Sequence, residues 1–169
     1  GFKPTYERIS REGVIPLSPT LDHIGFFVND VVMAKQVASI VISNWGMVIE
    51  SRKPILGIPD GKYLENTSKE GLKHFEETCK LLSTHYQIRR VQVMDDFDEI
   101  KSRHDAIMSY DASQVHKDWF AKHESLYSQK FSDLIKRGQS ITNYELHLKA
   151  RDNFREQITQ TMTDNKIDL

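Results

Sequence analysis

The spacing of apolar residues predicts a strand–helix–strand unit in the middle of the chain. Residues 54–59 form a short apolar run of the kind found in strands that are buried on both faces. After the capping residues 66–68, apolar side chains recur at helical spacing, at Leu72, Phe75, Cys79 and Leu82. Apolar residues at 88, 91 and 93 then indicate a second strand. Two strands joined through a helix are parallel, so we expect a βαβ crossover.

Helical periodicity predicts several long helices outside this unit. Asn29 or Asp30 can cap a helix to about Ser43, with its buried face supplied by Val32, Val37, Ile40 and Val41. Later helices are expected from Asp95 or Asp96 onward, over residues 125–136 with Arg137-Gly138 as a C-cap, and over residues 142–163. The last of these would bury apolar side chains from Leu146 to Met162.

Proline and glycine divide the chain unevenly. All five prolines and six of the eight glycines fall within residues 1–61. Because proline is excluded from helix interiors, the first third is expected to form loops and short strands, and the remainder to be mostly helical. The pattern as a whole predicts an α/β fold with a partly parallel or mixed sheet, a βαβ unit and several long helices.

Composition narrows the class of protein. The 169 residues are 38% hydrophobic and 28% charged, with a formal net charge of −1, which suits one ordinary domain over residues 1–169. A net charge near zero argues against a nucleic-acid or membrane-surface binder. Cys79 is the only cysteine, which excludes an internal disulfide and favours a reducing, cytoplasmic setting.

The spacing of residues along the chain shows no catalytic or metal-binding motif. The seven histidines are scattered without a metal-ligand spacing, and no nucleotide-binding glycine pattern is present. The acidic residues at 95, 96, 98 and 99 stand where a helix N-terminus favours negative charge, and Cys79 lies on an apolar helix stripe. We therefore expect neither a metal nor a cofactor.

The first 25 residues carry a more specific pattern. They run Gly1-Phe2-Lys3-Pro4-Thr5-Tyr6, then from Arg8 to Leu17, then Ser18-Pro19-Thr20-Leu21-Asp22-His23-Ile24-Gly25. This order resembles the amidase-signature family, whose pattern is Gly-x-Lys-Pro-Thr-x-Gly-x-x-Ser, a glycine and a proline downstream, and Leu-Asp-x-x-Gly-Pro. The likeness is dense over residues 1–25, called the signature segment below. It continues more weakly through the helix after Asn29, the strand at 55–58 and the final helix.

The resemblance implies an enzyme that hydrolyses carboxylic amides with a Ser–cis-Ser–Lys triad. In such enzymes the lysine works through the cis serine to deprotonate the nucleophilic serine, and backbone N–H groups form the oxyanion hole. The family's three catalytic positions lie upstream of the Gly-x-Lys-Pro-Thr element, so none is carried over to this chain, and Lys3 is not the triad lysine. The resemblance assigns structural support instead, to Lys3, Pro4, Thr5, Ser10, Asp22 and Gly25.

Two further roles remain open. Asp22 can hydrogen-bond toward the catalytic floor or can simply cap its own turn. The helices over residues 96–137 correspond to the variable part that walls the substrate cleft in this family. The aromatic residues there are pocket candidates, with core packing as the alternative: Tyr110, Trp119, Phe120 and Tyr127.

Two positions depart from the family pattern. Glu7 occupies the place of the usual glycine, and Phe26 stands where proline normally follows Gly25. If the glycine position requires positive φ, a glutamate there costs about 1 kcal/mol or more.

The expected protein is the C-terminal part of an amidase-signature hydrolase. Both ends interrupt recognisable elements, since the chain opens inside a motif and closes on Ile167-Asp168-Leu169, which resembles the first half of a strand. Residues 1–60 would supply signature loops and strands, and residues 61–169 the βαβ remainder and cleft-wall helices. The chain alone is expected to be inactive, and the complete enzyme to act on a small-molecule amide. A free-standing amidase is favoured over a glutamyl-tRNA amidotransferase subunit. The alternative is a non-catalytic interaction or pseudoenzyme module that binds a partner or itself through surfaces exposed by truncation.

Overall fold

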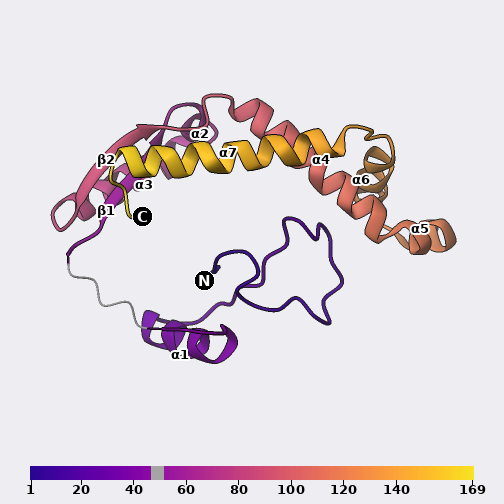
Figure 1. The fold of residues 1–169 in the computed structure, drawn as a ribbon, viewed down its shortest axis with the longest axis horizontal. Coiled ribbons are helices and arrows are strands. Elements are labelled where there is room, and N and C mark those ends of the chain that lie inside the picture. The colour runs from indigo at the N-terminus through magenta and orange to yellow at the C-terminus, as the bar shows by residue number, and fades with distance from the viewer. Residues whose placement is uncertain (47–51) are drawn as a thin grey trace. The chain divides into compact units, whose positions relative to one another are not determined.

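The structure, a computed structural model, describes residues 1–46 and 52–169. Figure 1 shows its helices and strands, and by its internal contacts the chain divides into two compact units. The first unit comprises Gly1–Ile49 and Ala106–Tyr144, and the second comprises Glu50–Asp105 and Glu145–Leu169. The expectation of a single domain over residues 1–169 stays a prediction.

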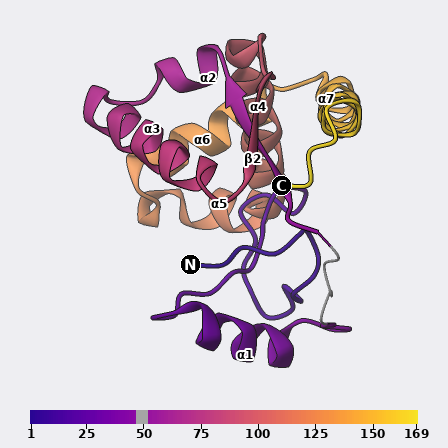
Figure 2. The ribbon, with the colours of Figure 1, turned by 90° about the vertical axis from the view of Figure 1, so that its left-hand side faces the viewer.

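The second unit contains the βαβ crossover, which confirms that prediction. Strands β1 (Ile55–Asp60) and β2 (Gln87–Gln92) are parallel, with Ile55 opposite Gln87. Helix α3 (Lys69–Ser83) connects them and lies beside β2 (Figure 2), after the short helix α2 (Lys62–Glu65). The Ser68 hydroxyl caps α3 by accepting a hydrogen bond from the Gly71 N–H at 3.0 Å.

The last residues of the chain lie along the free edge of β1. Leu169 donates its N–H to the Ile55 carbonyl and accepts from the Gly57 N–H, at 3.4 and 2.8 Å, which is the bonding pattern of a parallel ladder. Arg52 binds both carboxylate oxygens of Asp168, at 2.6 and 2.7 Å, and the Ile55 N–H donates to the same carboxylate at 2.8 Å. The C-terminal segment therefore pairs with the edge of β1 in the manner of a further parallel strand.

The first unit includes the predicted helix after Asp30. Helix α1 (Val31–Val41) begins where Asp30 Oδ1 accepts a hydrogen bond from the Met33 N–H at 2.8 Å. The predicted buried face is wrong, because Val32 and Ile40 are 68% and 83% exposed. Ala38 is the one buried side chain of this helix, so α1 packs through a small residue and leaves larger apolar side chains uncovered.

Residues 106–144 of the first unit are mostly helical, as predicted. This part contains the end of α4 (Phe97–Val115) from Ala106 onward, and the first residue of α7 (Tyr144–Asp164). Between them lie α5 (Lys117–His123), the 3-10 turn η1 (Glu124–Leu126) and α6 (Gln129–Gln139). Its core is built around Ile107, Ala112 and Ile135, which are at most 1% exposed.

Two expectations about these helices are wrong. Gly138 is not a C-cap but lies inside α6, where a Cβ atom would come 1.8 Å from the Ser109 carbonyl oxygen. Glycine is required there by the close approach of α4 and α6 rather than by its backbone angles. Helix α7 has the predicted extent but buries no residue completely, and Leu146 is 66% exposed.

Candidate functional site

The signature segment is closed on itself by backbone pairing at its two ends. Phe2 and Phe26 exchange N–H to carbonyl hydrogen bonds of 2.8 and 3.0 Å, and their rings lie 5.4 Å apart. A Cβ on Gly25 would come 2.6 Å from the Phe2 carbonyl oxygen, so this crossing requires glycine at that position. Phe26 uses the N–H that a proline would lack, which gives its departure from the family pattern a structural reason.

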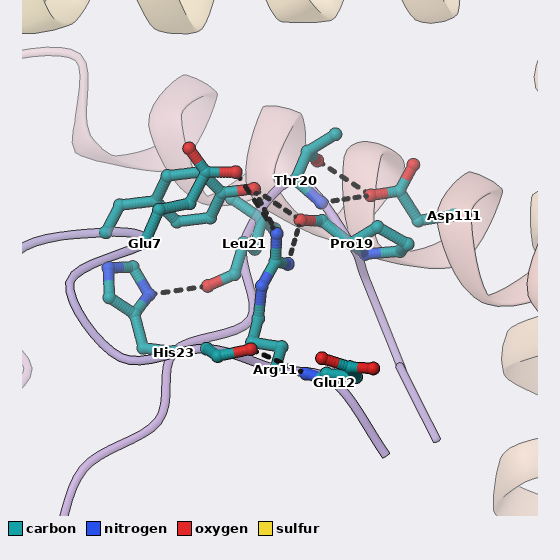
Figure 3. Close-up of polar contacts among 10 residues, drawn as sticks. Glu7, Arg11, Glu12, Pro19, Thr20, Leu21, His23 and Asp111 are labelled. Carbon is teal, nitrogen blue, oxygen red and sulfur yellow. Dashed lines mark hydrogen bonds and ion pairs between the residues drawn. The ribbon is translucent and has the colours of Figure 1, made fainter. Parts of the chain in front are cut away.

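A second set of contacts fixes the interior of the segment around the carbonyl oxygen of Pro19 (Figure 3). The Tyr6 hydroxyl donates to this oxygen at 2.6 Å, and the Arg11 guanidinium donates to it as well. Arg11 also donates to the Tyr6 hydroxyl at 3.0 Å, and its guanidinium carbon lies 4.9 Å from the centre of the Tyr6 ring. The phenol and the guanidinium thus hold two distant turns of the loop together.

Glu7 has a φ of 63°, which places it in the left-handed region. The condition under which a glutamate is strained at this position, a positive φ, is therefore met. A residue with a Cβ is strained in this conformation by about 1–2 kcal/mol. The Glu7 carboxylate lies 3.4 Å from the Arg11 guanidinium, an exposed ion pair that offsets little of this strain.

Asp22 caps its own turn. Its carboxylate accepts hydrogen bonds from the N–H groups of Leu17, at 3.0 Å, and Ser18, at 3.1 and 3.2 Å. These contacts of the carboxylate are those of a residue that caps its own turn, which is one of the two roles that the sequence left open for Asp22.

The other predicted support residues occupy the surface and first turns of the segment. Pro4 is buried, whereas Lys3, Thr5 and Ser10 are exposed. The Lys3 ammonium donates to the Pro4 carbonyl at 3.3 Å, and the Ser10 hydroxyl accepts from the Glu12 N–H at 3.2 Å. These contacts are consistent with structural support, and the catalytic relevance of these residues stays a prediction.

Asp111 on α4 anchors the signature segment, and sequence reasoning missed it. Asp111 is 6% exposed, and its carboxylate accepts hydrogen bonds from the Ser18 hydroxyl at 2.7 Å, the Thr20 hydroxyl at 2.7 Å and the Thr20 N–H at 3.3 Å. The Tyr144 hydroxyl donates to its other oxygen at 2.6 Å. With both oxygens occupied by donors, this carboxylate serves as an anchor rather than as a base. One signal was available, because Asp111 lies one helical turn after the apolar Ile107 and therefore shares its helix face.

Two of the four candidate aromatic residues contact His116, at the start of α5, and a third contacts one of these two. The His116 ring makes edge-to-face contacts with Trp119 and Tyr127, at 5.6 and 5.7 Å between ring centres. Phe120 is buried and contacts Tyr127 at 5.2 Å. These contacts place Phe120 in the core, whereas Trp119 is about half exposed. Tyr110 lies outside this cluster and stacks on Tyr144 at 4.0 Å.

No group of three or more His, Cys, Asp or Glu side chains is arranged to hold a metal ion within residues 1–46 and 52–169. Cys79 is buried on α3. Over the same described residues, none of the helices has the length and apolar character needed to cross a membrane.

Comparison with known proteins gives concordant similarities. The family model described as Amidase matches residues 1–168. The glutamyl-tRNA(Gln) amidotransferase A-type subunit of Mycoplasma pneumoniae is 27% identical over 139 residues, which are 65% of this chain and 28% of that protein. The protein of the same name from Mycoplasma genitalium is 48% identical over 44 residues, which are 26% of this chain and 9% of that protein.

Among solved structures, one described as "Crystal structure of amidase" superposes with a TM-score of 0.82. The match covers 95% of this chain and 37% of that chain at 22% identity, which is a likeness of fold. The chain therefore spans well under half the length of each of these three proteins.

Proposed function

The chain belongs to the amidase family, and on that premise we propose that it forms part of an enzyme that hydrolyses carboxylic amide bonds. The observation that carries the proposal is the signature segment, which is closed by the Phe2–Phe26 pairing and anchored on α4 by Asp111. The family match over residues 1–168 supports the same conclusion.

We propose that this chain contributes the scaffold rather than the reacting groups. The amide carbon would be attacked by the serine of a Ser–cis-Ser–Lys triad, the C–N bond would break, and water would release the acid. None of the three triad positions is carried over to this chain by the resemblance. Lys3, Pro4 and Thr5 would support the segment that leaves the nucleophile's loop.

A serine-reactive probe tests this division of roles. The 169-residue chain should show no mass increase after treatment with a fluorophosphonate and should not hydrolyse small amides. A protein that carries this chain together with a serine- and glycine-rich segment before Gly1 should gain one adduct and be active. Hydrolysis by the 169 residues alone would overturn the proposal that the chain lacks the catalytic serine.

The substrate class is a further part of the proposal. We propose a small-molecule amide and no nucleic-acid partner. The free-standing amidase expected from the sequence stays a prediction, and the curated relatives bear the name of an amidotransferase subunit instead. Release of ammonia from simple amides without any added protein would favour the free-standing enzyme. Activity that requires the other subunits of an amidotransferase would instead favour an amidotransferase subunit.

A second candidate, a non-catalytic module that associates with itself or a partner, is favoured by the uncovered side chains of α1. Ile40 is 83% exposed and Val32 68% exposed, and Phe27 just before the helix is 93% exposed. Apolar surface of this kind promotes association. Light scattering of the chain distinguishes the two candidates, because a monomer that unfolds cooperatively would count against the module.

A further inference from the structure

We infer that the groove between α4 and α6 is a binding site for a small molecule that combines a hydrocarbon body with a carboxylate. The hydrocarbon body lies on Met108, Phe131 and Leu134. The carboxylate binds Arg137, and Lys130 adds a second positive charge beside it. The inference does not depend on the proposed function, because it concerns binding to helices of the first unit and its test does not use amide hydrolysis.

The groove has the size and the apolar lining of a small-molecule site. It encloses about 600 Å³ within the first unit, and ligand sites commonly have such a volume. Apolar side chains from both helices line it, with Met108 from α4 and Phe131 and Leu134 from α6. Leu134 is 8% exposed, and the other two are half-buried. A hydrocarbon group that covers these side chains is removed from water together with them, which favours binding.

The frame of the groove is fixed before any ligand binds. Gly138 lets α6 approach α4 so closely that a Cβ on it would come 1.8 Å from the Ser109 carbonyl oxygen. The Phe131 ring is held by an edge-to-face contact with His116, at 4.9 Å, and by stacking on Tyr127, at 5.6 Å. A ligand therefore meets a lining that is already ordered and loses little affinity to ordering it.

Two cations of the groove have no partner among the described residues. Lys130 and Arg137 line the cavity, and both are exposed. Within residues 1–46 and 52–169, neither side chain makes an ion pair or a hydrogen bond. Because they are seven residues apart, they lie on one face of α6, about 10 Å apart along its axis. Lys136 differs from both, since it is bound to Glu124 at 2.6 Å and does not line the cavity.

Asp133, an acidic residue of the same lining, does not neutralise these two cations. Its carboxylate accepts a hydrogen bond from the side-chain amide of Gln129 at 2.8 Å. Its charge also acts on Lys136, whose ammonium pKa is raised chiefly by the hydrogen bond to Glu124 and to a smaller extent by Asp133. The described lining thus carries two cations against one anion, which favours a negatively charged ligand.

A carboxylate attached to a hydrocarbon suits this combination of groups. The Arg137 guanidinium offers parallel N–H donors that match the two oxygens of a carboxylate. Inorganic phosphate also accepts from such donors, but it would leave the apolar side chains of the groove in contact with water. A neutral apolar molecule would cover those side chains and leave the cations unused. The ligand class is therefore an aryl or alkyl carboxylate.

Nuclear magnetic resonance tests the site with 4-phenylbutyrate and the 169-residue chain. A ligand of this size should bind with a Kd of about 1 mM and shift the amide signals of residues 128–137 and Met108. The signals of α3, in the second unit, should not move. Butyrate, which lacks the ring, and 4-phenylbutanol, which lacks the charge, should each bind about tenfold more weakly. Absence of shifts in α6 at about 10 mM ligand, or equal binding of 4-phenylbutanol, overturns the inference.

Substitutions at exposed positions of α6 test the assignment of residues. Arg137→Gln should raise the Kd about tenfold, because it removes the charged donors. Lys136→Gln is the matched control, since it removes the neighbouring cation that does not line the cavity, and its Kd should stay within about twofold. Asp133→Asn can still accept from Gln129 and should lower the Kd about twofold by removing the repelling charge.

The two directions of change guard against a trivial loss of folding. A variant that misfolds loses binding, whereas the Asp133→Asn variant is expected to gain it. If Lys136→Gln weakens binding as much as Arg137→Gln, the attraction is a general one to surface cations and the inference is refuted. An unchanged or raised Kd in Asp133→Asn refutes it as well.

Discussion

Replacing Glu7 with glycine should stabilise the chain. Glu7 is held at a φ of 63° by the hydrogen bonds that Tyr6 and Arg11 make to Pro19 on the far side of the loop. A side chain with a Cβ is strained in this conformation and glycine is not. The substitution therefore removes strain from the folded state at the position where the family has glycine.

The expected change in the free energy of unfolding for Glu7→Gly is the difference between one favourable and two unfavourable effects. Relief of the left-handed strain contributes about 1–2 kcal/mol. Glycine loses about 0.5–1 kcal/mol through the greater freedom of the unfolded chain. The exposed ion pair between Glu7 and Arg11, at 3.4 Å, contributes about 0.3 kcal/mol, near the lower end for surface pairs. A net gain of about 0.5 kcal/mol in the free energy of unfolding follows for Glu7→Gly.

Glu7→Ala gives a sharper comparison. Alanine keeps the strain and loses the ion pair, so it should be slightly less stable than the original chain. The glycine variant should then exceed the alanine variant by about 1 kcal/mol, or about 2–4 °C in Tm for a chain of this length. Urea unfolding followed by circular dichroism measures the difference between the two variants directly.

Glu12→Gly is the matched control, because Glu12 is an exposed residue of the same loop without a positive φ. Glycine relieves no strain there and should lower stability by about 0.5–1 kcal/mol. If Glu7→Ala proves as stable as Glu7→Gly, or if Glu12→Gly stabilises equally, the explanation from backbone strain at Glu7 is refuted.

Three further substitutions probe other contacts. Asp111→Asn should lower the free energy of unfolding by about 2–3 kcal/mol in urea titrations, because an amide cannot accept all the donors that meet this buried carboxylate. Gly138→Ala should destabilise by about 3 kcal/mol or more in the same assay, since its Cβ would come 1.8 Å from the Ser109 carbonyl oxygen. Asp168→Asn should remove an acid-sensitive contribution, because the hydrogen bond from Arg52 holds the pKa of the Asp168 carboxyl below its ordinary value. That contribution is present above the unfolded pKa of about 3.9 and is lost as the pH falls through the folded pKa.

Each of these expectations has a contradicting result. A fully stable Asp111→Asn chain would show that the carboxylate does not anchor the signature segment. A Gly138→Ala variant with unchanged unfolding would show that α4 and α6 can separate without loss. For Asp168, stability curves of the original and variant chains that run parallel below about pH 4 would remove the proposed dependence on Arg52.

The local elements follow from short-range chemistry, which explains how many of them could be predicted. Asp30 and Ser68 accept hydrogen bonds from the first turns of α1 and α3, as their capping positions indicate. The apolar run at 54–59 and the helical spacing after it predict β1 and α3, because periodicity depends only on neighbours along the chain. The strain at Glu7 could be predicted from the family pattern because a positive φ is a property of a single residue.

Contacts between segments that are far apart in the sequence could not be predicted in this way. Gly138 has the sequence context of a C-cap, yet α6 continues to Gln139, and the glycine is needed because Ser109 of another helix lies against it. Asp111 has the sequence context of an ordinary helical aspartate, yet Ser18 and Thr20 reach it across more than 90 residues of chain. The apolar stripe predicted to be buried on α1 is exposed, because burial depends on which surfaces meet rather than on periodicity.

By itself, the sequence determined the βαβ unit, the starts of α1 and α3, the family resemblance and the place where the backbone is strained. Each of these depends on residues close together in the chain or on one residue's permitted angles. Only the tertiary structure decided that Asp111 holds the signature segment, and that Trp119 and Tyr127 contact His116 while Phe120 packs on Tyr127. Hydrogen-bond partners and ring contacts of this kind depend on distances through space, which residue spacing along the chain does not specify.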